Sequence, residues 1–155
     1  MDMGLKIVSC DNLRVALWLH TEQDPPAELW TSAIEQLSAL KQELRGDVSS
    51  LRMLVITDGG APNALQRSAL FTQLLEGKVK SAVVTTVLAN RFKRGIATAI
   101  FWLNPNFRAF GPDQLDQALA HLDLDGHGER LIEQLREVQR SVAPTKTLPM
   151  LSTGG

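Results

Sequence analysis

The stretch LRMLVITDGGAPNALQR, residues 51–67, constrains the fold of this 155-residue chain more than any other part of it. Residues 51–57 are almost all apolar, as in a buried strand. Asp58-Gly59-Gly60 then breaks the strand, and a helical pattern begins shortly after it. Because a strand, a turn and a helix in succession form the building unit of α/β proteins, this stretch predicts a sheet with helices packed on it.

Two strands and a helix are expected before this stretch. Residues 5–10 and 13–19 have the β-branched, partly alternating pattern of strands, and the dipeptide DN between them is a hairpin turn signal. The run DPP then signals the start of an amphipathic helix over residues 24–46. The chain is therefore expected to open with a β-hairpin and one helix.

Strands and helices continue to alternate after it. The expected elements are a helix over 62–76, a strand over 80–87, a helix over 90–103, a strand over 107–110, a helix over 113–122 and a last helix at about 129–142. In the first of these helices, the residues expected to face the core are Leu65, Ala69, Thr72 and Leu75. The last helix carries one apolar stripe, formed by Leu131, Leu135, Val138 and Val142. This stripe fits burial on the chain's own sheet, a homodimer interface or a partner helix, and the sequence leaves the three open.

The expected order is β-β-α-β-α-β-α-β-α, followed by the extra C-terminal helix. It predicts the α/β class, with a mixed, mostly parallel sheet of four to five strands and helices packed on it. We expect a single α/β domain over residues 1–142. Residues 143–155 contain two prolines, several hydroxyl residues and a final Gly-Gly without periodicity, so we expect a disordered tail there.

Composition excludes several classes of protein. The hydrophobic content of 44% and charged content of 21% are ordinary for a soluble globular protein. The single cysteine, Cys10, excludes an intramolecular disulfide and a Cys-rich zinc cluster. The net charge of −1 implies no nucleic-acid partner. The longest apolar run, residues 96–103, is far shorter than the roughly 20 residues that span a bilayer. We therefore expect no membrane insertion and a cytoplasmic location.

The sequence offers no recognisable catalytic or metal-binding motif. His20, His121 and His127 are scattered, without the spacing of a metal site, so we expect all three at the surface. No G-x-S-x-G or other triad context is present, and no phosphate-loop Lys-Ser/Thr follows the glycines. We therefore expect no catalytic residue, no metal and no cofactor.

The first candidate binding set lies at the central turn and comprises Asp58, Gly59, Gly60, Asn63 and Arg67. Glycines let a partner approach the backbone, and free N–H groups at a helix start, together with an arginine, favour an anion or a carboxylate. The alternative is a tight turn between strand and helix that needs glycine for positive φ, with the aspartate as a cap.

The second candidate set follows the next strand, which ends in Thr85 and Thr86. It comprises Asn90, Arg91, Lys93 and Arg94. Cations in the first turns of a helix oppose its dipole, so their presence there indicates an acidic partner. The alternatives are a solvated face and internal pairing with the acidic residues after Asp113. Because the carboxyl ends of parallel strands share one edge, we expect both candidate sets at that edge.

The order of elements resembles that of the STAS (anti-sigma-factor antagonist) fold and its lipid-carrier-like relatives. LRMLVITDGG stands where those domains place their central strand and the following loop, and FRAFGPDQLDQALAHL is similar to their closing strand and helix. The likeness covers roughly residues 5–122 and implies a signalling or scaffolding module that binds a protein partner. Phosphorylation-switched members carry an Asp-Ser-Ser-Gly-like loop. Asp58 matches the aspartate, but Gly59 and Gly60 stand in the serine positions, so the switch hydroxyl is missing.

These observations favour a non-enzymatic regulatory or signalling module of bacterial type that binds a protein partner through the two candidate sets. Two alternatives stay open. One is a small-anion or ligand-binding or enzymatic α/β domain that uses the same edge. The other is a structural subunit that forms a homo-oligomer.

Overall fold

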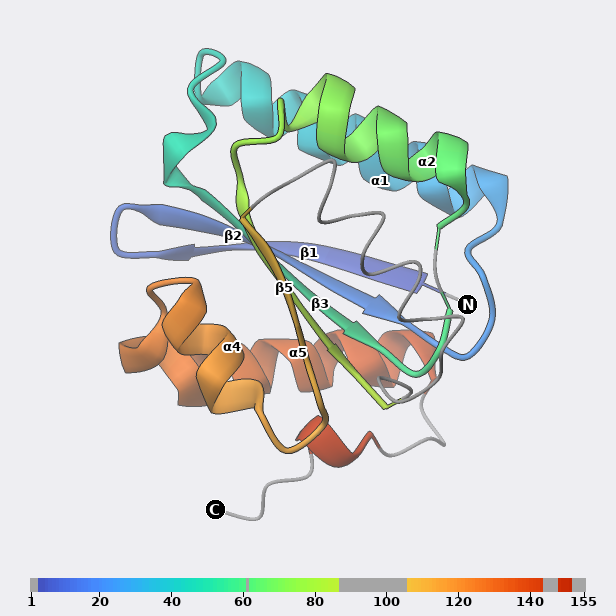
Figure 1. Ribbon diagram of the computed structural model, residues 1–155, viewed down its shortest axis with the longest axis vertical. Helices are drawn as coiled ribbons and strands as arrows, with labels where there is room; N and C mark the ends of the chain where they lie inside the picture. The colour runs from blue at the N-terminus through green and yellow to red at the C-terminus, as the bar shows by residue number, and fades with distance from the viewer. Residues whose placement is uncertain (1–2, 61, 87–105, 144–147, 152–155) are drawn as a thin grey trace.

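The computed structural model describes residues 3–60, 62–86, 106–143 and 148–151 (Figure 1). Its strands are β1 (Met3–Cys10), β2 (Leu13–His20), β3 (Leu51–Thr57), β4 (Lys80–Thr85) and β5 (Phe107–Phe110). Its helices are α1 (Ala27–Glu43), α2 (Ala64–Ser68), α4 (Leu115–His121) and α5 (Gly128–Val142). A π-helical turn (Ala69–Leu74) continues α2, and short 3-10 turns form at Val48–Ser50, Asp125–His127 and Pro149–Leu151.

The five strands form one sheet in chain order, β1-β2-β3-β4-β5. β1 and β2 are antiparallel, with Met3 opposite His20 and Cys10 opposite Leu13. The pairs β2–β3, β3–β4 and β4–β5 are all parallel. The prediction of an α/β fold with a mixed, mostly parallel sheet is therefore confirmed, including the hairpin that opens it.

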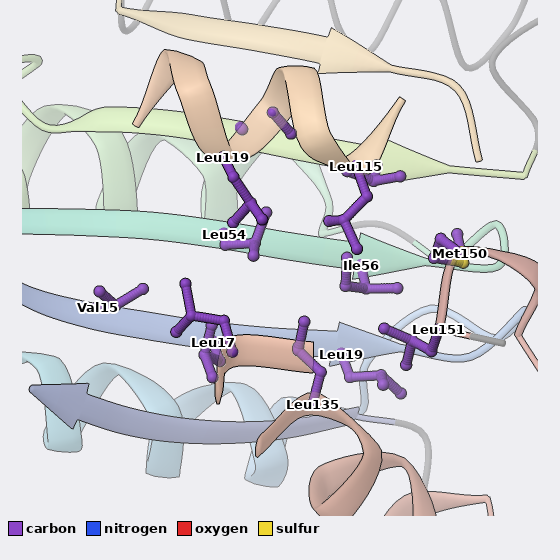
Figure 2. Close-up of a cluster of buried hydrophobic side chains, with 14 of the residues drawn as sticks. Val15, Leu17, Leu19, Leu54, Ile56, Leu115, Leu119, Leu135, Met150 and Leu151 are labelled. Carbon is purple, nitrogen blue, oxygen red and sulfur yellow. The ribbon is translucent and has the colours of Figure 1, made fainter. Parts of the chain in front are cut away.

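Helices cover both faces of the sheet. Figure 1 shows α1 and α2 on one side and α4 and α5 on the other. Side chains alternate along β2 accordingly: Ala16 and Trp18 join the core under α1, while Leu17 and Leu19 join the core under α4 and α5 (Figure 2). Burial on both faces explains why the central strands are almost continuously apolar.

The apolar stripe of α5 packs against the chain's own sheet. Leu131, Leu135, Val138 and Val142 are all buried, and the helix lies over β1 and β2. Gly4 of β1 makes this contact close, because a Cβ there would lie 2.6 Å from Val142 Cγ2. Of the three uses open for this stripe, burial on the chain's own sheet is the one observed.

The helix expected over residues 62–76 differs from the structure in its phase. It changes from α to π after Ser68, and the Leu75 N–H donates to Leu70 O, five residues back, at 2.9 Å. Leu70 and Leu75 are buried, whereas Leu65 is 84% exposed. At about 100° per residue, a residue five positions before Leu70 lies about 140° around the helix from it. The prediction that Leu65 faces the core was therefore wrong.

Part of the tail that was expected to be disordered, residues 148–151, is folded against the core. Leu148, Met150 and Leu151 are buried in the core between the sheet, α4 and α5. The Arg136 Nε donates a hydrogen bond to Leu151 O at 2.9 Å. Three apolar side chains in four residues are enough to anchor a segment that lacks the periodicity of a helix or a strand.

None of the helices in the described part of the chain is long and apolar enough to cross a membrane.

Replacing Leu151 with alanine tests the tail contact. Because this side chain is 4% exposed in the core, we expect Leu151→Ala to lower the free energy of unfolding by about 2–4 kcal/mol. The exposed Leu65→Ala is the matched control, with an expected change within about 0.5 kcal/mol. Urea unfolding measures both variants. Equal, small effects would show that the tail does not contribute to the core.

Candidate functional site

The turn after β3 uses its backbone donors within the protein. The Asp58 N–H donates to His20 O at 3.1 Å, and the Gly60 N–H donates to Thr21 O at 2.8 Å. The Gly59 N–H donates to Thr57 Oγ1 at 3.1 Å, and that hydroxyl donates to Gly60 O at 2.7 Å. None of these three N–H groups is left for an anion, so the turn is not built as a phosphate or carboxylate cradle.

Both glycines of this turn are buried and needed by its shape. Gly59 has a φ of 130°, which L side chains rarely adopt. A Cβ on Gly60 would lie 2.0 Å from Gln23 O and 2.8 Å from Thr21 O, inside the backbone of the segment after β2. The tight-turn alternative therefore accounts for both glycines.

The Asp58 side chain connects the ends of β3 and β4. Thr86 Oγ1 donates to Asp58 Oδ1 at 2.7 Å, and the Thr86 N–H donates to Thr57 O at 3.3 Å. Asp58 is half-buried, so this carboxylate is placed by its neighbouring strand. Thr86, which directly follows β4, thus lies beside Asp58 of the first candidate set, as the shared edge of parallel strands predicts.

Asn63 and Arg67 stabilise the start of α2. Asn63 Oδ1 accepts from the Gln66 N–H at 2.8 Å, and Gln66 Oε1 accepts from the Asn63 N–H at 2.9 Å. These two bonds form a capping box. Arg67 Nη1 donates to Pro62 O at 2.9 Å. Both side chains hold the helix start in place, and Asn63 itself is exposed.

This rigid helix start carries Leu65, the exposed large hydrophobic side chain in the described part of the chain. Its exposure was not predicted, because helical spacing alone places Leu65 with Ala69 on an inward face. Asn63 and Gln66 at capping-box spacing place Leu65 in the first turn of the helix, but this spacing does not tell which side of the helix is buried.

The second candidate set lies outside the described residues, because Asn90, Arg91, Lys93 and Arg94 all fall in the segment 87–105. The structure therefore does not relate these four side chains to the first set.

A row of buried polar side chains crosses the carboxyl edge of the sheet. His20, Thr57 and Thr85 occupy matching positions on β2, β3 and β4. His20 is 2% exposed and lies 5.8 Å, between ring centroids, from Trp18. In the part of the chain that the structure describes, His20 Nδ1 and Trp18 Nε1 are buried without a hydrogen-bond partner. Such unpaired buried atoms are rare in folded proteins.

The same burial lowers the pKa of His20 to about 4, against a smaller opposing effect from the charge of Asp24. The imidazole is therefore neutral at neutral pH. The expectation that His20 lies at the surface was wrong, because the side chain at this last position of β2 is buried beside the ring of Trp18.

The other groups considered for chemistry are engaged elsewhere. Burial raises the pKa of the Cys10 thiol, which makes it a poor nucleophile. His121 Nε2 lies 2.8 Å from Asn106 O, and His127 Nε2 lies 3.1 Å from Asp11 Oδ2. Residues 3–60, 62–86, 106–143 and 148–151 contain no group of three or more His, Cys, Asp or Glu side chains that could hold a metal.

Comparison of the chain with protein-family models, with curated proteins and with solved structures gives no match.

Substitution of Gly60 tests the backbone contact at the turn. We expect Gly60→Ala to lower the free energy of unfolding by about 3 kcal/mol or more, because the added Cβ meets backbone that cannot move aside cheaply. Gly126→Ala is the control, since a Cβ at Gly126 meets nothing within 4 Å. Chemical denaturation measures both, and a Gly60→Ala protein as stable as Gly126→Ala would contradict the contact.

The buried His20 predicts a loss of stability at acid pH. Its pKa is about 4 in the folded protein and about 6.5 when unfolded, so the unfolded chain binds the proton first as pH falls. The contribution of the neutral His20 to the free energy of unfolding is fully present above pH 6.5 and is lost as pH falls towards 4. The loss is about 2 kcal/mol at pH 5. Urea unfolding at pH 7.5 and pH 5 should show this for the wild type and for His121→Asn, but a smaller difference for His20→Phe. An equal pH dependence in all three proteins would contradict a neutral, buried His20.

Proposed function

We propose that the chain is a non-enzymatic regulatory or signalling module that binds a protein partner at the carboxyl edge of its sheet. The observation that carries the proposal is Leu65, a leucine 84% exposed at a capped helix start beside the Asp58–Gly60 turn. Side chains that fill a pocket of the partner carry much of the binding energy of protein interfaces, and leucine takes this role less often than Trp, Tyr or Arg. A single exposed leucine is common, and its rigid setting next to the candidate edge is what favours a docking role here.

The frame around Leu65 reduces the cost of binding. The capping box and the Arg67–Pro62 hydrogen bond fix the helix start before a partner arrives. Preorganised surfaces lose less conformational entropy on association. In this proposal Asp58, Gly59 and Gly60 support the surface from inside, and the cations Arg91, Lys93 and Arg94, which follow β4 in the sequence, are proposed to pair with acidic groups of the partner.

The proposal also assigns the module a STAS-like fold. The antiparallel first pair, the parallel strands in chain order and the turn after β3 support that likeness. Glycines occupy the positions of the phosphorylated serine, so the proposed binding does not involve a phosphate switch at this turn.

A small-ligand domain is the second candidate function. The unpaired buried atoms Trp18 Nε1 and His20 Nδ1 favour it, because a ligand oxygen could bond to both kinds of group. The internally bonded turn disfavours it, since the backbone N–H groups that would hold an anion already have partners. The α5 stripe does not support the homo-oligomer alternative, because its four side chains are buried on the chain's own sheet.

Quantitative pull-down from native lysate tests the docking edge. Leu65→Asp should fold normally, because the side chain is exposed, and should lose the partner that the wild type retains. Ala39→Asp, at an exposed position of α1, adds the same charge elsewhere and should retain that partner. Reversal of Arg91, Lys93 and Arg94 to glutamate should weaken the same interaction. Identical partner sets for the wild type, Leu65→Asp and the charge reversal would refute the proposal.

A further inference from the structure

A groove with an apolar floor lies between α4, the Asp125–His127 turn and α5. Its volume is about 450 Å³. Leu115, Leu119, Ile132 and Met150 line the floor, and Figure 2 shows the first two projecting from α4 towards the sheet. The groove therefore opens directly over the core between the sheet, α4 and α5.

Four carboxylates surround this floor. They belong to Asp113, Asp116, Asp125 and Glu129, and the described residues that line the groove include no lysine, arginine or histidine. All four side chains are exposed, and within the described ranges none of them makes a hydrogen bond or an ion pair. The described rim of the groove is therefore acidic, and it favours a partner group of positive charge.

Asp123, two residues before the groove residue Asp125, forms ion pairs with Arg52 and Lys80. Its Oδ2 lies 3.1 Å from Arg52 Nη2 and 2.9 Å from Lys80 Nζ. These contacts lower the pKa of Asp123, chiefly through its hydrogen bonds with Lys80 and Arg52. Asp123 is thus paired with two cations, whereas among the described residues no lysine or arginine forms an ion pair with the four carboxylates that line the groove.

Helix dipoles explain part of this arrangement. Asp116 and Glu129 stand in the first turns of α4 and α5, where an acidic side chain is favoured. The dipoles do not explain the open apolar floor between the two helices, nor why its described lining carries acidic but no basic side chains.

We infer that this groove is a docking site for a short cationic amphipathic segment of a partner protein. An apolar side chain of that segment fills the floor over Leu119 and Ile132, and its lysine or arginine side chains meet the carboxylates. A floor that excludes water, with a charged rim, is the usual anatomy of a peptide-binding groove. Nucleic acid and anionic membrane fit poorly, because their phosphates would face four carboxylates.

This inference goes beyond the proposed function and does not rest on the same surface. The groove belongs to the α4–α5 side of the sheet, whereas Leu65 belongs to α2 on the other side (Figure 1). Loss of binding at the groove therefore leaves the proposed docking edge intact, and the reverse also holds.

Fluorescence anisotropy with a labelled peptide, KLLKKLLKKLLK, tests the inference on the full chain. The double variant Asp116→Lys/Glu129→Lys should raise the Kd for this peptide at least about tenfold. The matched control is Glu28→Lys/Glu35→Lys on α1, which makes the same change in net charge at exposed positions, one of them also in a first turn. It should change the Kd less than about twofold. Ile132→Ser should weaken binding without a change in charge.

Two comparison peptides separate the groove from bulk electrostatics. Replacing every leucine of the probe with serine should weaken binding strongly, and replacing every lysine with glutamate should abolish it. The inference is overturned if the probe does not bind, if both double variants bind it equally, or if the serine peptide binds as tightly as the probe. It is also overturned if the free protein self-associates in light scattering and the groove variant does not, because the occupant would then be a second copy of the chain.

Discussion

The carboxyl edge of the sheet depends on one backbone contact, the approach of Gly60 to the segment that follows β2. The Gly60 N–H donates to Thr21 O, and no Cβ fits between Gly60 and Gln23 O. The Asp58 N–H and the Asp58 carboxylate extend the same connection to His20 and Thr86. The ends of three neighbouring strands are therefore fixed to one another before any ligand or partner is considered.

This constraint decides what the edge can do. A loop that binds phosphate presents free N–H groups to the anion, whereas here those groups bond within the protein. What remains available is the set of side chains held outside the turn, with Leu65 and Asn63 exposed at the start of α2. The proposed function follows from this division, with the glycines as support and the helix start as the surface.

The strands and the apolar stripe of α5 could be predicted from the sequence, because residues that are buried within one element follow the regular spacing of that element. The run at residues 51–57 is apolar on both faces, and Leu131 to Val142 repeat at helical spacing. Leu65 could not be placed, because a π-helical turn changes the phase of the helix without any change in composition. His20 and the apolar residues at 148–151 were missed for a related reason. Their burial depends on which distant elements cover them, and local pattern does not encode that.

Native-state amide hydrogen exchange at Asp58, Gly59 and Gly60 measures the fixed turn most directly, since it reads the three N–H groups in the unmodified protein. If these groups are bonded as the structure has them, they should exchange as slowly as the amides of β3, such as that of Ile56. Exchange at the rate of the exposed turn at Gly126 would mean that the N–H groups are free. The edge would then be open to an anion, and the account of a rigid support for protein docking would fail.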